Sequence, residues 1–259
     1  MNPIAFQLGN LKIYWYSIFI LIGAIIAIFL FLRSAKKEKI EEEFSINLLF
    51  YGIIIGIIGA RLYYCLFNLD YYLANPLNII KIWEGGLAIH GGIIAGGLWF
   101  IYYSKKHHKN VWQILDFASI SIIIAQAIGR WGNFFNQEAH GIATTKETLK
   151  ALFIPNFVIE GMNINGIYYY PTFYFEFLWN LLGFVVLLIL KKKKVKTGKI
   201  FGVYLMWYSF ARFFIEGMRT DSLCLGPIRV AQLMSLILFI AGLVIIILRS
   251  RKEDKANAR

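Results

Sequence analysis

Long apolar runs separated by short polar connections dominate the chain. Ile13–Leu32 contains twenty residues without a charge, and Val230–Leu248 contains nineteen. A helix needs roughly 20 mainly apolar residues to cross a bilayer. We predict seven membrane-spanning helices, at about residues 13–33, 44–67, 86–104, 111–130, 171–190, 200–217 and 229–249. The pattern therefore indicates an all-α polytopic membrane protein.

Lysine and arginine are distributed unevenly between alternate connections. The connections 33–43, 104–110 and 191–199, together with the segment from residue 249 onward, hold 18 of the 27 Lys and Arg residues. Because basic residues accumulate in cytoplasmic connections, we predict an external N-terminus and a cytoplasmic C-terminus. The basic cluster follows the first apolar run instead of preceding it, so we interpret that run as a retained helix and not as a cleaved signal peptide.

Composition narrows the class of protein. The chain is 58% hydrophobic and 16% charged, whereas soluble domains have about 45–50% apolar and about 25% charged residues. Its net charge of +12 comes largely from residues between the spans, so we attribute it to lipid headgroups and topology and expect no nucleic-acid partner. Outer-membrane barrels show short alternating strands instead of long apolar runs. Cys65 and Cys224 have no disulfide or metal-ligand spacing.

About forty residues separate the fourth and fifth predicted spans, which is long for a passive connector. Within this segment, Asn165-Gly166 is a favoured hairpin turn flanked by Phe157–Glu160 and Ile167–Tyr170. We therefore expect a single transmembrane domain over residues 1–259, with a small external cap at 131–170 that contains a β-hairpin.

Polar and ionisable side chains within the predicted spans converge on one membrane face. Each such group is costly in a bilayer and needs a reason. One explanation is that each side chain near a helix end simply reaches the water, which accounts for individual cases. A shared polar site would also explain why spans of alternating direction carry such residues at the same membrane face. With the orientation above, the outer ends hold Tyr16, Arg61, His90, Arg130, Glu176, Arg212, Glu216 and Gln232. Asp116, near a cytoplasmic end, departs from this pattern.

The end of the fourth predicted span is especially polar. Residues 129–138 read Gly-Arg-Trp-Gly-Asn-Phe-Phe-Asn-Gln-Glu, and Gly141 follows. A guanidinium group suits bidentate binding of phosphate, and glycine allows backbone N–H groups to approach a ligand. The stretch is a candidate phosphate site, with polar capping of a helix end as the alternative.

Two further clusters allow both a functional and a structural interpretation. His90 lies in a glycine-rich stretch at residues 85–92, where small residues commonly serve close helix packing. Tyr208, Arg212 and Glu216 are spaced by four residues and so share one helix face. Arg212 and Glu216 either serve a ligand or form a structural ion pair.

The chain lacks motifs for a nucleotide, a zinc protease or a serine hydrolase, and we expect no cofactor or metal. An enzyme with this pattern would act most simply on a phosphate-bearing lipid that enters from the bilayer. A transporter or flippase would instead need polar groups through the cytoplasmic half, where Asp116 stands nearly alone. A headgroup phosphotransferase would usually need a carboxylate cluster for a divalent metal, and none is evident.

Residues 129–141 resemble the signature of the bacterial prolipoprotein diacylglyceryl transferase family, a Gly-Arg-x-Gly-Asn-Phe-x-Asn-x-Glu-x-x-Gly pattern. The His90-Gly91-Gly92 element, Tyr16 after Trp15 and the Arg212-x-x-x-Glu216 pair also match, as do the length and the order of elements. The resemblance covers nearly the whole chain.

The resemblance weakens around Pro171. The family usually has His before this proline and Tyr before the following glutamate, whereas this chain has Tyr170 and Phe175 at those places. Glu176 itself matches.

The resemblance implies a reaction at the outer face of the bacterial cell membrane. The diacylglyceryl group of phosphatidylglycerol would pass to the lipobox cysteine thiol of a preprolipoprotein, which forms a thioether and releases glycerol phosphate. Arg130 and Arg212 would hold the phosphodiester, and His90 or a carboxylate would help deprotonate the thiol. The remaining candidates, expected to bind or orient substrate, are Tyr16, Asn133, Asn136, Glu138, Gly141, Glu176, Tyr208 and Glu216. The expected partners are phosphatidylglycerol, the lipobox peptide and membrane lipids, and the oligomeric state stays open.

Overall fold

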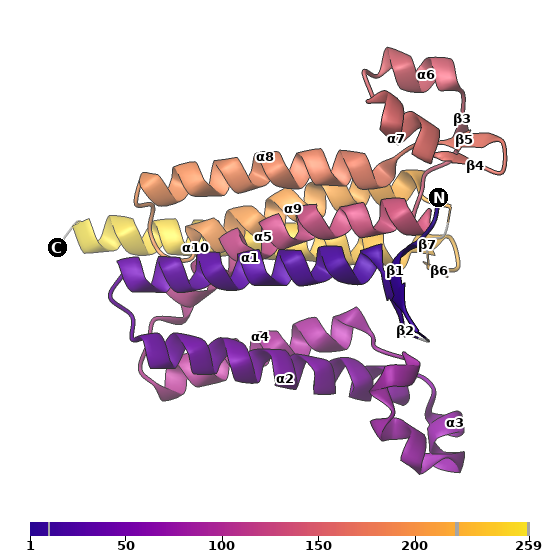
Figure 1. Ribbon diagram of the computed structural model, residues 1–259. Coiled ribbons are helices and arrows are strands. Elements are labelled where there is room, and N and C mark those ends of the chain that lie inside the picture. The colour runs from indigo at the N-terminus through magenta and orange to yellow at the C-terminus, as the bar shows by residue number, and fades with distance from the viewer. Residues whose placement is uncertain (10, 221–222, 258–259) are drawn as a thin grey trace. The chain divides into compact units, whose positions relative to one another are not determined.

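The computed structural model describes residues 1–9, 11–220 and 223–257, and helices account for most of them (Figure 1). The long helices are α1 Trp15–Lys37, α2 Glu42–Leu66, α4 Ile89–Lys106, α5 Val111–Asn136, α8 Thr172–Lys192, α9 Lys199–Met218 and α10 Val230–Asn257. The short helices are α3 Leu69–Ala74, η1 Pro76–Ile80, η2 Ile82–Glu84, α6 Lys146–Ala151 and α7 Asn156–Gly161. The strands are β1 Ile4–Leu8, β2 Leu11–Tyr14, β3 Ala143–Thr144, β4 Asn163–Ile164, β5 Ile167–Tyr169, β6 Cys224–Leu225 and β7 Ile228–Arg229.

Each of the seven predicted spans coincides with a long helix. Within the described residues, five of these helices are long and apolar enough to cross a membrane, namely α1, α2, α5, α8 and α10. By length and composition the chain is therefore a multi-pass membrane protein. Helices α4 and α9, of 18 and 20 residues, fall outside this group, so the count of seven spans stays a prediction.

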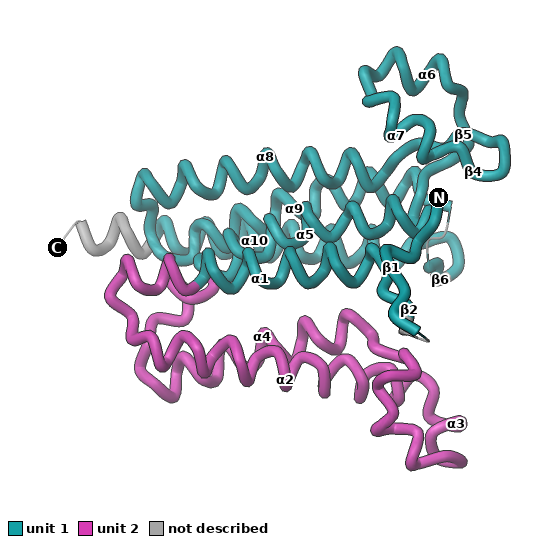
Figure 2. The backbone as a smooth tube through the Cα atoms, in the orientation of Figure 1, with its two compact units in different colours: residues 1–31, 116–259 teal, residues 32–115 magenta. Residues whose placement is uncertain are grey.

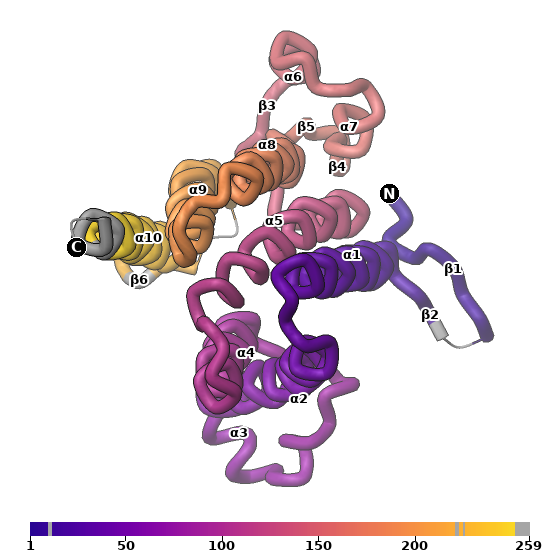
Figure 3. Tube along the Cα trace, turned by 90° about the vertical axis from the view of Figure 1, so that its left-hand side faces the viewer, coloured from indigo at the N-terminus to yellow at the C-terminus, as the bar shows by residue number. Residues whose placement is uncertain are grey.

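The chain divides into two compact units, residues 1–31 with 116–259 and residues 32–115 (Figure 2). In the first unit, 50% of the residues in the 18-residue apolar stretch of α5 are buried, compared with 11% in the corresponding stretches of α1 and α10. Small buried residues such as Ala118, Ser121 and Ala127 let neighbouring helices approach α5 closely. Helix α5 is thus the central helix of this unit (Figure 3). Its last turns carry residues 129–136, the first part of the signature stretch at 129–141.

Helices α8, α9 and α10 are joined by specific contacts. The indole Nε1 groups of Trp179 and Trp207 each donate to the other's backbone carbonyl, at 2.9 and 3.0 Å, and their rings stack. Helix α10 approaches α9 so closely that a Cβ atom on Gly242 would lie 2.6 Å from the carbonyl oxygen of Gly202. These contacts set the position of α9, which carries Arg212.

Asp116 has a structural explanation. Its buried carboxylate accepts hydrogen bonds from the backbone N–H groups of Gly198, at 2.7 Å, and Phe201, at 2.8 Å. The first N–H groups of a helix have no partner within the helix, and a carboxylate there also interacts favourably with the helix dipole. Asp116 on α5 therefore caps the start of α9.

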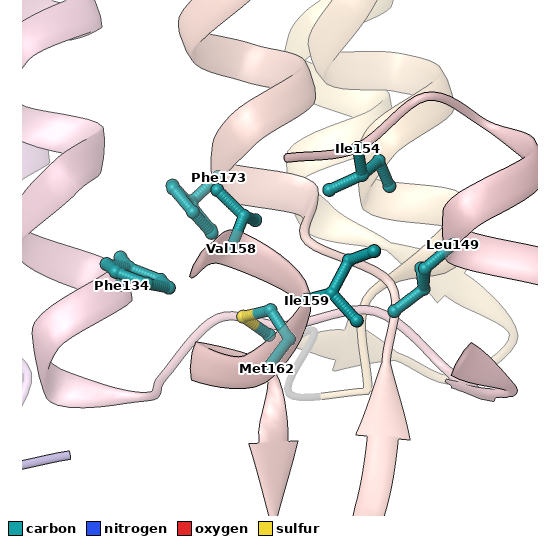
Figure 4. Close-up of a cluster of buried hydrophobic side chains, with 7 residues drawn as sticks. All are labelled: Phe134, Leu149, Ile154, Val158, Ile159, Met162 and Phe173. Carbon is teal, nitrogen blue, oxygen red and sulfur yellow. The ribbon is translucent and has the colours of Figure 1, made fainter. Parts of the chain in front are cut away.

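The segment between α5 and α8 forms a small module with its own core. Leu149, Ile154, Val158, Ile159 and Met162 pack on Phe134 of α5 and Phe173 of α8 (Figure 4). Strands β3, β5 and β4 form an antiparallel sheet in that order.

Two details of this segment differ from the prediction. Phe157–Glu160 lies in helix α7 and not in a strand, because its buried residues Val158, Ile159 and Met162 follow helical spacing. Asn165 and Gly166 connect β4 to β5 with positive φ angles of 52° and 85°, which such a turn favours. Helix α5 also continues to Asn136, so the polar connection starts at residue 137, six residues later than residue 131.

The second unit consists of α2, α3, η1, η2 and α4. Helices α2 and α4 approach at Gly59 and Gly91, where a Cβ atom on Gly91 would lie 2.3 Å from the carbonyl oxygen of Gly59. The segment between these helices folds around the buried guanidinium of Arg61. That group donates to the backbone carbonyls of Asn78, Ile79, Lys81, Gly85 and Gly86 at 2.5–3.4 Å.

Candidate functional site

Two arginines from different helices meet at one carboxylate in the first unit. Arg130 lies near the end of α5 and Glu176 in the second turn of α8, and Arg130 pairs through Nε with Glu176 Oε2. Arg212 on α9 contacts the other carboxylate oxygen, with Nη1 2.8 Å from Glu176 Oε1. Its Nη2 group lies 2.6 Å from Glu216 Oε2, one turn further along α9. The structure thus joins four of the predicted residues into one ion-pair cluster.

This cluster is largely shielded from the surroundings. The side chains of Glu176 and Glu216 are 7% and 4% exposed, and those of Arg130 and Arg212 are 20% and 16% exposed. Buried charges are tolerated when they are paired and hydrogen-bonded. Two guanidinium and two carboxylate groups balance one another, so the cluster holds both arginines in place. Arg130 uses Nε for its pair, which leaves its two terminal nitrogens outside that contact.

The backbone of α9 is supported at the same end. Arg229 of β7 donates from Nη1 to the backbone carbonyl of Glu216. Gln232 on α10 donates to the carbonyl of Phe213 at 3.0 Å. Neighbouring α10 and the connection before it therefore fix the last turns of α9, where Arg212 and Glu216 lie.

The residues after Arg130 form a compact polar turn. Asn133 and Asn136 each donate from Nδ2 to Glu138 Oε1, at 2.9 and 3.4 Å. The backbone N–H of Glu138 also bonds the carbonyl of Asn133, at 3.1 Å. The structure therefore brings these three predicted residues together, and the amide side chains orient an exposed carboxylate.

Glycines in the signature stretch serve close packing of neighbouring residues. A Cβ atom on Gly132 would lie 2.7 Å from Tyr16 Cδ2, and one on Gly141 would lie 2.8 Å from Tyr170 Cβ. The Gly141 N–H also donates to the Tyr170 carbonyl at 2.9 Å. Sequence reasoning assigned such glycines to close approach of a ligand, whereas the structure places side chains and backbone of this chain there.

Tyr16 and Tyr208 occupy the same unit as the arginines. Tyr16 is the second residue of α1, is 38% exposed and lies against Gly132. Tyr208 is half-buried one turn before Arg212 on α9, and its ring centroid lies 6.3 Å from that of Tyr204. Both tyrosines therefore lie beside residues of the cluster or of the signature stretch.

His90 belongs to the second unit. It is the second residue of α4, is exposed, and has its ring centroid 6.3 Å from that of Tyr63. Gly91, the next residue, packs against Gly59 and Tyr63. The packing interpretation of the glycines is confirmed for Gly91, and the role of His90 stays a prediction.

Arg61 has a different role from Arg130 and Arg212. Its five hydrogen bonds go to backbone carbonyls of residues 78–86, and it stacks 5.2 Å from the Tyr72 ring centroid. A position near the outer end of a predicted span suggested a polar site for all three arginines. Their contact partners distinguish them, because Arg61 binds backbone carbonyls of a loop, whereas Arg130 and Arg212 bind carboxylates.

Comparison with known proteins supports one assignment. The family model for prolipoprotein diacylglyceryl transferase matches residues 3–248. The chain is 49% identical over 254 residues to the phosphatidylglycerol–prolipoprotein diacylglyceryl transferase of Listeria welshimeri, covering 98% of this chain and 92% of that protein. It is 47% identical over 257 residues to the enzyme of the same name from Enterococcus faecalis, with 98% and 92% covered. The enzyme of that name from Bacillus cereus is 44% identical over 259 residues, with 100% and 96% covered. The chain therefore belongs to the prolipoprotein diacylglyceryl transferase family.

Proposed function

We propose that this protein transfers the diacylglyceryl group of phosphatidylglycerol to the lipobox cysteine of a preprolipoprotein, the first step of lipoprotein maturation. The observation that carries the proposal is the meeting of Arg130 and Arg212 at Glu176, in a member of this family. A pair of oriented guanidinium groups at the end of apolar helices suits a phosphodiester carried by a membrane lipid.

The bond changes define what the site has to do. The cysteine sulfur attacks the glycerol carbon that carries the phosphate, a C–S bond forms, and the C–O bond to the phosphate breaks. The thiol proton leaves to a base, and the electron pair of the broken bond stays on glycerol phosphate. Negative charge therefore develops on the departing phosphate, where fixed donors lower the barrier.

The arginines take the central roles in this proposal. Arg130 and Arg212 hold the phosphodiester and stabilise the charge that develops on it. Glu176 and Glu216 fix the planes of the two guanidinium groups, so little reorganisation is needed when substrate binds. His90, or a carboxylate, accepts the thiol proton.

The remaining candidates shape the substrate site. Asn133 and Asn136 hold the Glu138 carboxylate, which is able to accept hydrogen bonds from the free glycerol headgroup. Tyr16, Gly141 and Tyr208 line the site that binds the lipid.

We also propose an arrangement in the membrane. The chain crosses the bacterial cell membrane seven times as one transmembrane domain, with its N-terminus outside, its C-terminus in the cytoplasm and the cap at residues 131–170 outside. The lysine and arginine distribution supports this orientation. The arginine cluster then faces the outer leaflet, where secreted preprolipoproteins present their cysteine.

A reconstituted assay tests the proposed function. The purified protein is incorporated into liposomes that contain phosphatidylglycerol, and a lipobox peptide is added. The proposal predicts a peptide whose mass increases by one diacylglyceryl group, together with release of glycerol phosphate. A control peptide with serine in place of the lipobox cysteine should stay unmodified. Modification of the serine peptide, or none of the cysteine peptide by the folded protein, would contradict the proposal.

A further inference from the structure

Helix α6 of the module ends in a Schellman motif, a turn that bonds the last carbonyls of a helix. The Phe153 N–H donates to the Lys150 carbonyl at 3.0 Å, and the Ile154 N–H donates to the Leu149 carbonyl at 3.3 Å. Ile154 and Leu149 are both buried in the core of the module, which is the hydrophobic contact that usually accompanies this motif. The turn places Phe153 in the left-handed region, with a φ angle of 55°. Glycine is the usual residue at this position because it has no Cβ atom.

Phenylalanine is therefore an unusual residue at this turn. The other non-glycine residues with positive φ, within the described ranges 1–9, 11–220 and 223–257, are polar or small, namely Lys39, His108, Gln137, Ala139, Asn165 and Lys194. The Phe153 side chain is 94% exposed, so its ring contributes little to the turn or to the core. Glycine would fit the backbone better, and the ring has to serve a contact outside the module.

The connection between α6 and α7, which contains Phe153, lies beside a membrane-spanning helix. Helix α8 is a candidate span and begins at Thr172, directly after the module. Figures 1 and 3 place α6 on the side of α8 that faces away from α1. In Figure 1 the connection lies on the side of the module toward the Lys192 end of α8. The bilayer around α8 therefore extends beneath this connection.

Aromatic side chains join the module to the apolar surface of α8. Phe157 of α7 is 59% exposed, and its ring stacks on Trp131 with the centroids 6.1 Å apart. Trp131 in turn contacts Phe177 of α8, at 5.3 Å between centroids, and the next residue, Leu178, is 44% exposed. Aromatic residues are enriched where a membrane protein meets the water interface. The exposed apolar side chains of the module are thus continuous with a surface that faces lipid.

The charge around the connection also suits a lipid surface. Lys150 is exposed three residues before Phe153, and Leu152 is 49% exposed. The acidic residues of the two helices lie away from the connection, with Glu147 in the first turn of α6 and Glu160 near the end of α7. A cation next to exposed aromatic and aliphatic side chains is typical of segments that lie in the interface between lipid phosphates and acyl chains.

We propose that the α6–α7 connection inserts Phe153 and Leu152 into the bilayer interface, in the leaflet where α8 begins, with Lys150 at the level of the lipid phosphates. The partner is the lipid surface itself, without selection of one headgroup. The module then has two attachments, its core against Phe134 and Phe173 and its connection in lipid. The proposal rests on the membrane spans and is independent of the transferase reaction.

Photocrosslinking from position 153 tests the proposal. The photoreactive residue p-benzoylphenylalanine replaces Phe153 in the full-length protein, which is placed in phosphatidylcholine nanodiscs, irradiated and analysed by mass spectrometry. Ile167 provides the matched control position, because it is 49% exposed and follows the β4–β5 turn, which Figure 1 shows at the opposite side of the module. We expect several-fold more phospholipid adducts at position 153 than at position 167. Equal adducts at the two positions, or none at position 153, would overturn the proposal.

A protein partner for Phe153 is tested in the same experiment. Lipid adducts at position 153 should persist when a lipobox peptide is added. Adducts with the peptide in place of lipid would overturn the proposal and assign the ring to peptide binding.

Hydrogen exchange in nanodiscs provides a second measurement. Phe153→Asn removes the ring but keeps a residue that tolerates positive φ, so the turn itself should persist. We expect the amides of residues 152–154 to exchange several-fold faster in this variant, because they lose the cover of the lipid interface, while β4 and β5 exchange as before. Unchanged exchange at residues 152–154 would contradict insertion of Phe153 into the bilayer.

Discussion

Glu176 on α8 binds Arg212 on α9 through a 2.8 Å contact between Oε1 and Nη1, while its other oxygen pairs with Arg130 on α5. One carboxylate therefore links helices α5, α8 and α9. Glu176 is for this reason a positioning residue for both.

Replacing Glu176 with glutamine should remove this link. Loss of one partner of a buried ion pair leaves uncompensated charge and costs about 3–5 kcal/mol. We expect Glu176→Gln to lower the unfolding temperature in detergent and to abolish most transfer activity. Glu147→Gln is a matched control, because Glu147 is exposed on α6 and makes none of these contacts. The same unfolding temperature and rate in both variants would contradict the positioning role.

Gly132 should not tolerate a methyl group. The added Cβ would lie 2.7 Å from the Tyr16 ring and 3.1 Å from its Cα. Overpacking of this kind costs about 1–3 kcal/mol, and Tyr16 would have to move. Gly129→Ala, one turn earlier on α5, is the control, since its Cβ would meet only Ile20 Cδ1 at 3.4 Å. Thermal unfolding and the transfer rate should both fall in Gly132→Ala and stay near the original values in Gly129→Ala.

The membrane orientation is tested by reporter fusions. A reporter fused after Lys194 should be cytoplasmic, because that connection is rich in lysine, and one inserted near Lys146 should be external. Alkaline phosphatase and a fluorescent protein serve as complementary reporters at both positions. The reverse result at either site would remove the argument that the polar ends share the outer face.

The positions of the helices were predictable because each depends on a long local apolar pattern. The ion pairs of Glu176 with Arg130 and Arg212 were not predictable, because the spacing of residues along one helix does not show which side chains of other helices they contact. Arg61 shows the same limit, because its five carbonyl partners come from a loop without a sequence pattern.

Several short elements were also missed, among them α7 and β1. Phe157–Glu160 contains β-branched and aromatic residues typical of strands, but Pro155 before it and the helical spacing of Val158, Ile159 and Met162 favour the observed helix α7. Strand β1 preceding the first span shows alternation at Ile4, Phe6 and Leu8, a weak signal next to the long apolar run.

Lysine should not replace either arginine of the cluster. Lysine keeps the charge but is a point donor that cannot form the planar fork. Loss of one donor to a transition state typically lowers the rate about 10²–10³-fold. We expect Arg130→Lys and Arg212→Lys each to show such a loss in the liposome assay while remaining folded. Rates near that of the unmodified protein in both variants would mean that a bidentate phosphate contact is not required.

In the proposed mechanism the arginines stabilise the leaving phosphate, while His90 assists a thiol that ionises readily. A free cysteine has a pKa of about 8.5, so raising the pH produces thiolate without a general base. Raising the pH does not replace a lost guanidinium that donates hydrogen bonds to the phosphate. The most direct test is the initial rate of transfer against pH for His90→Gln and Arg130→Ala in liposomes, with folding verified. We expect His90→Gln to retain turnover that recovers as the pH rises toward about 9, and Arg130→Ala not to recover. An inactive His90→Gln at every pH, or an Arg130→Ala rescued by alkali, would contradict it.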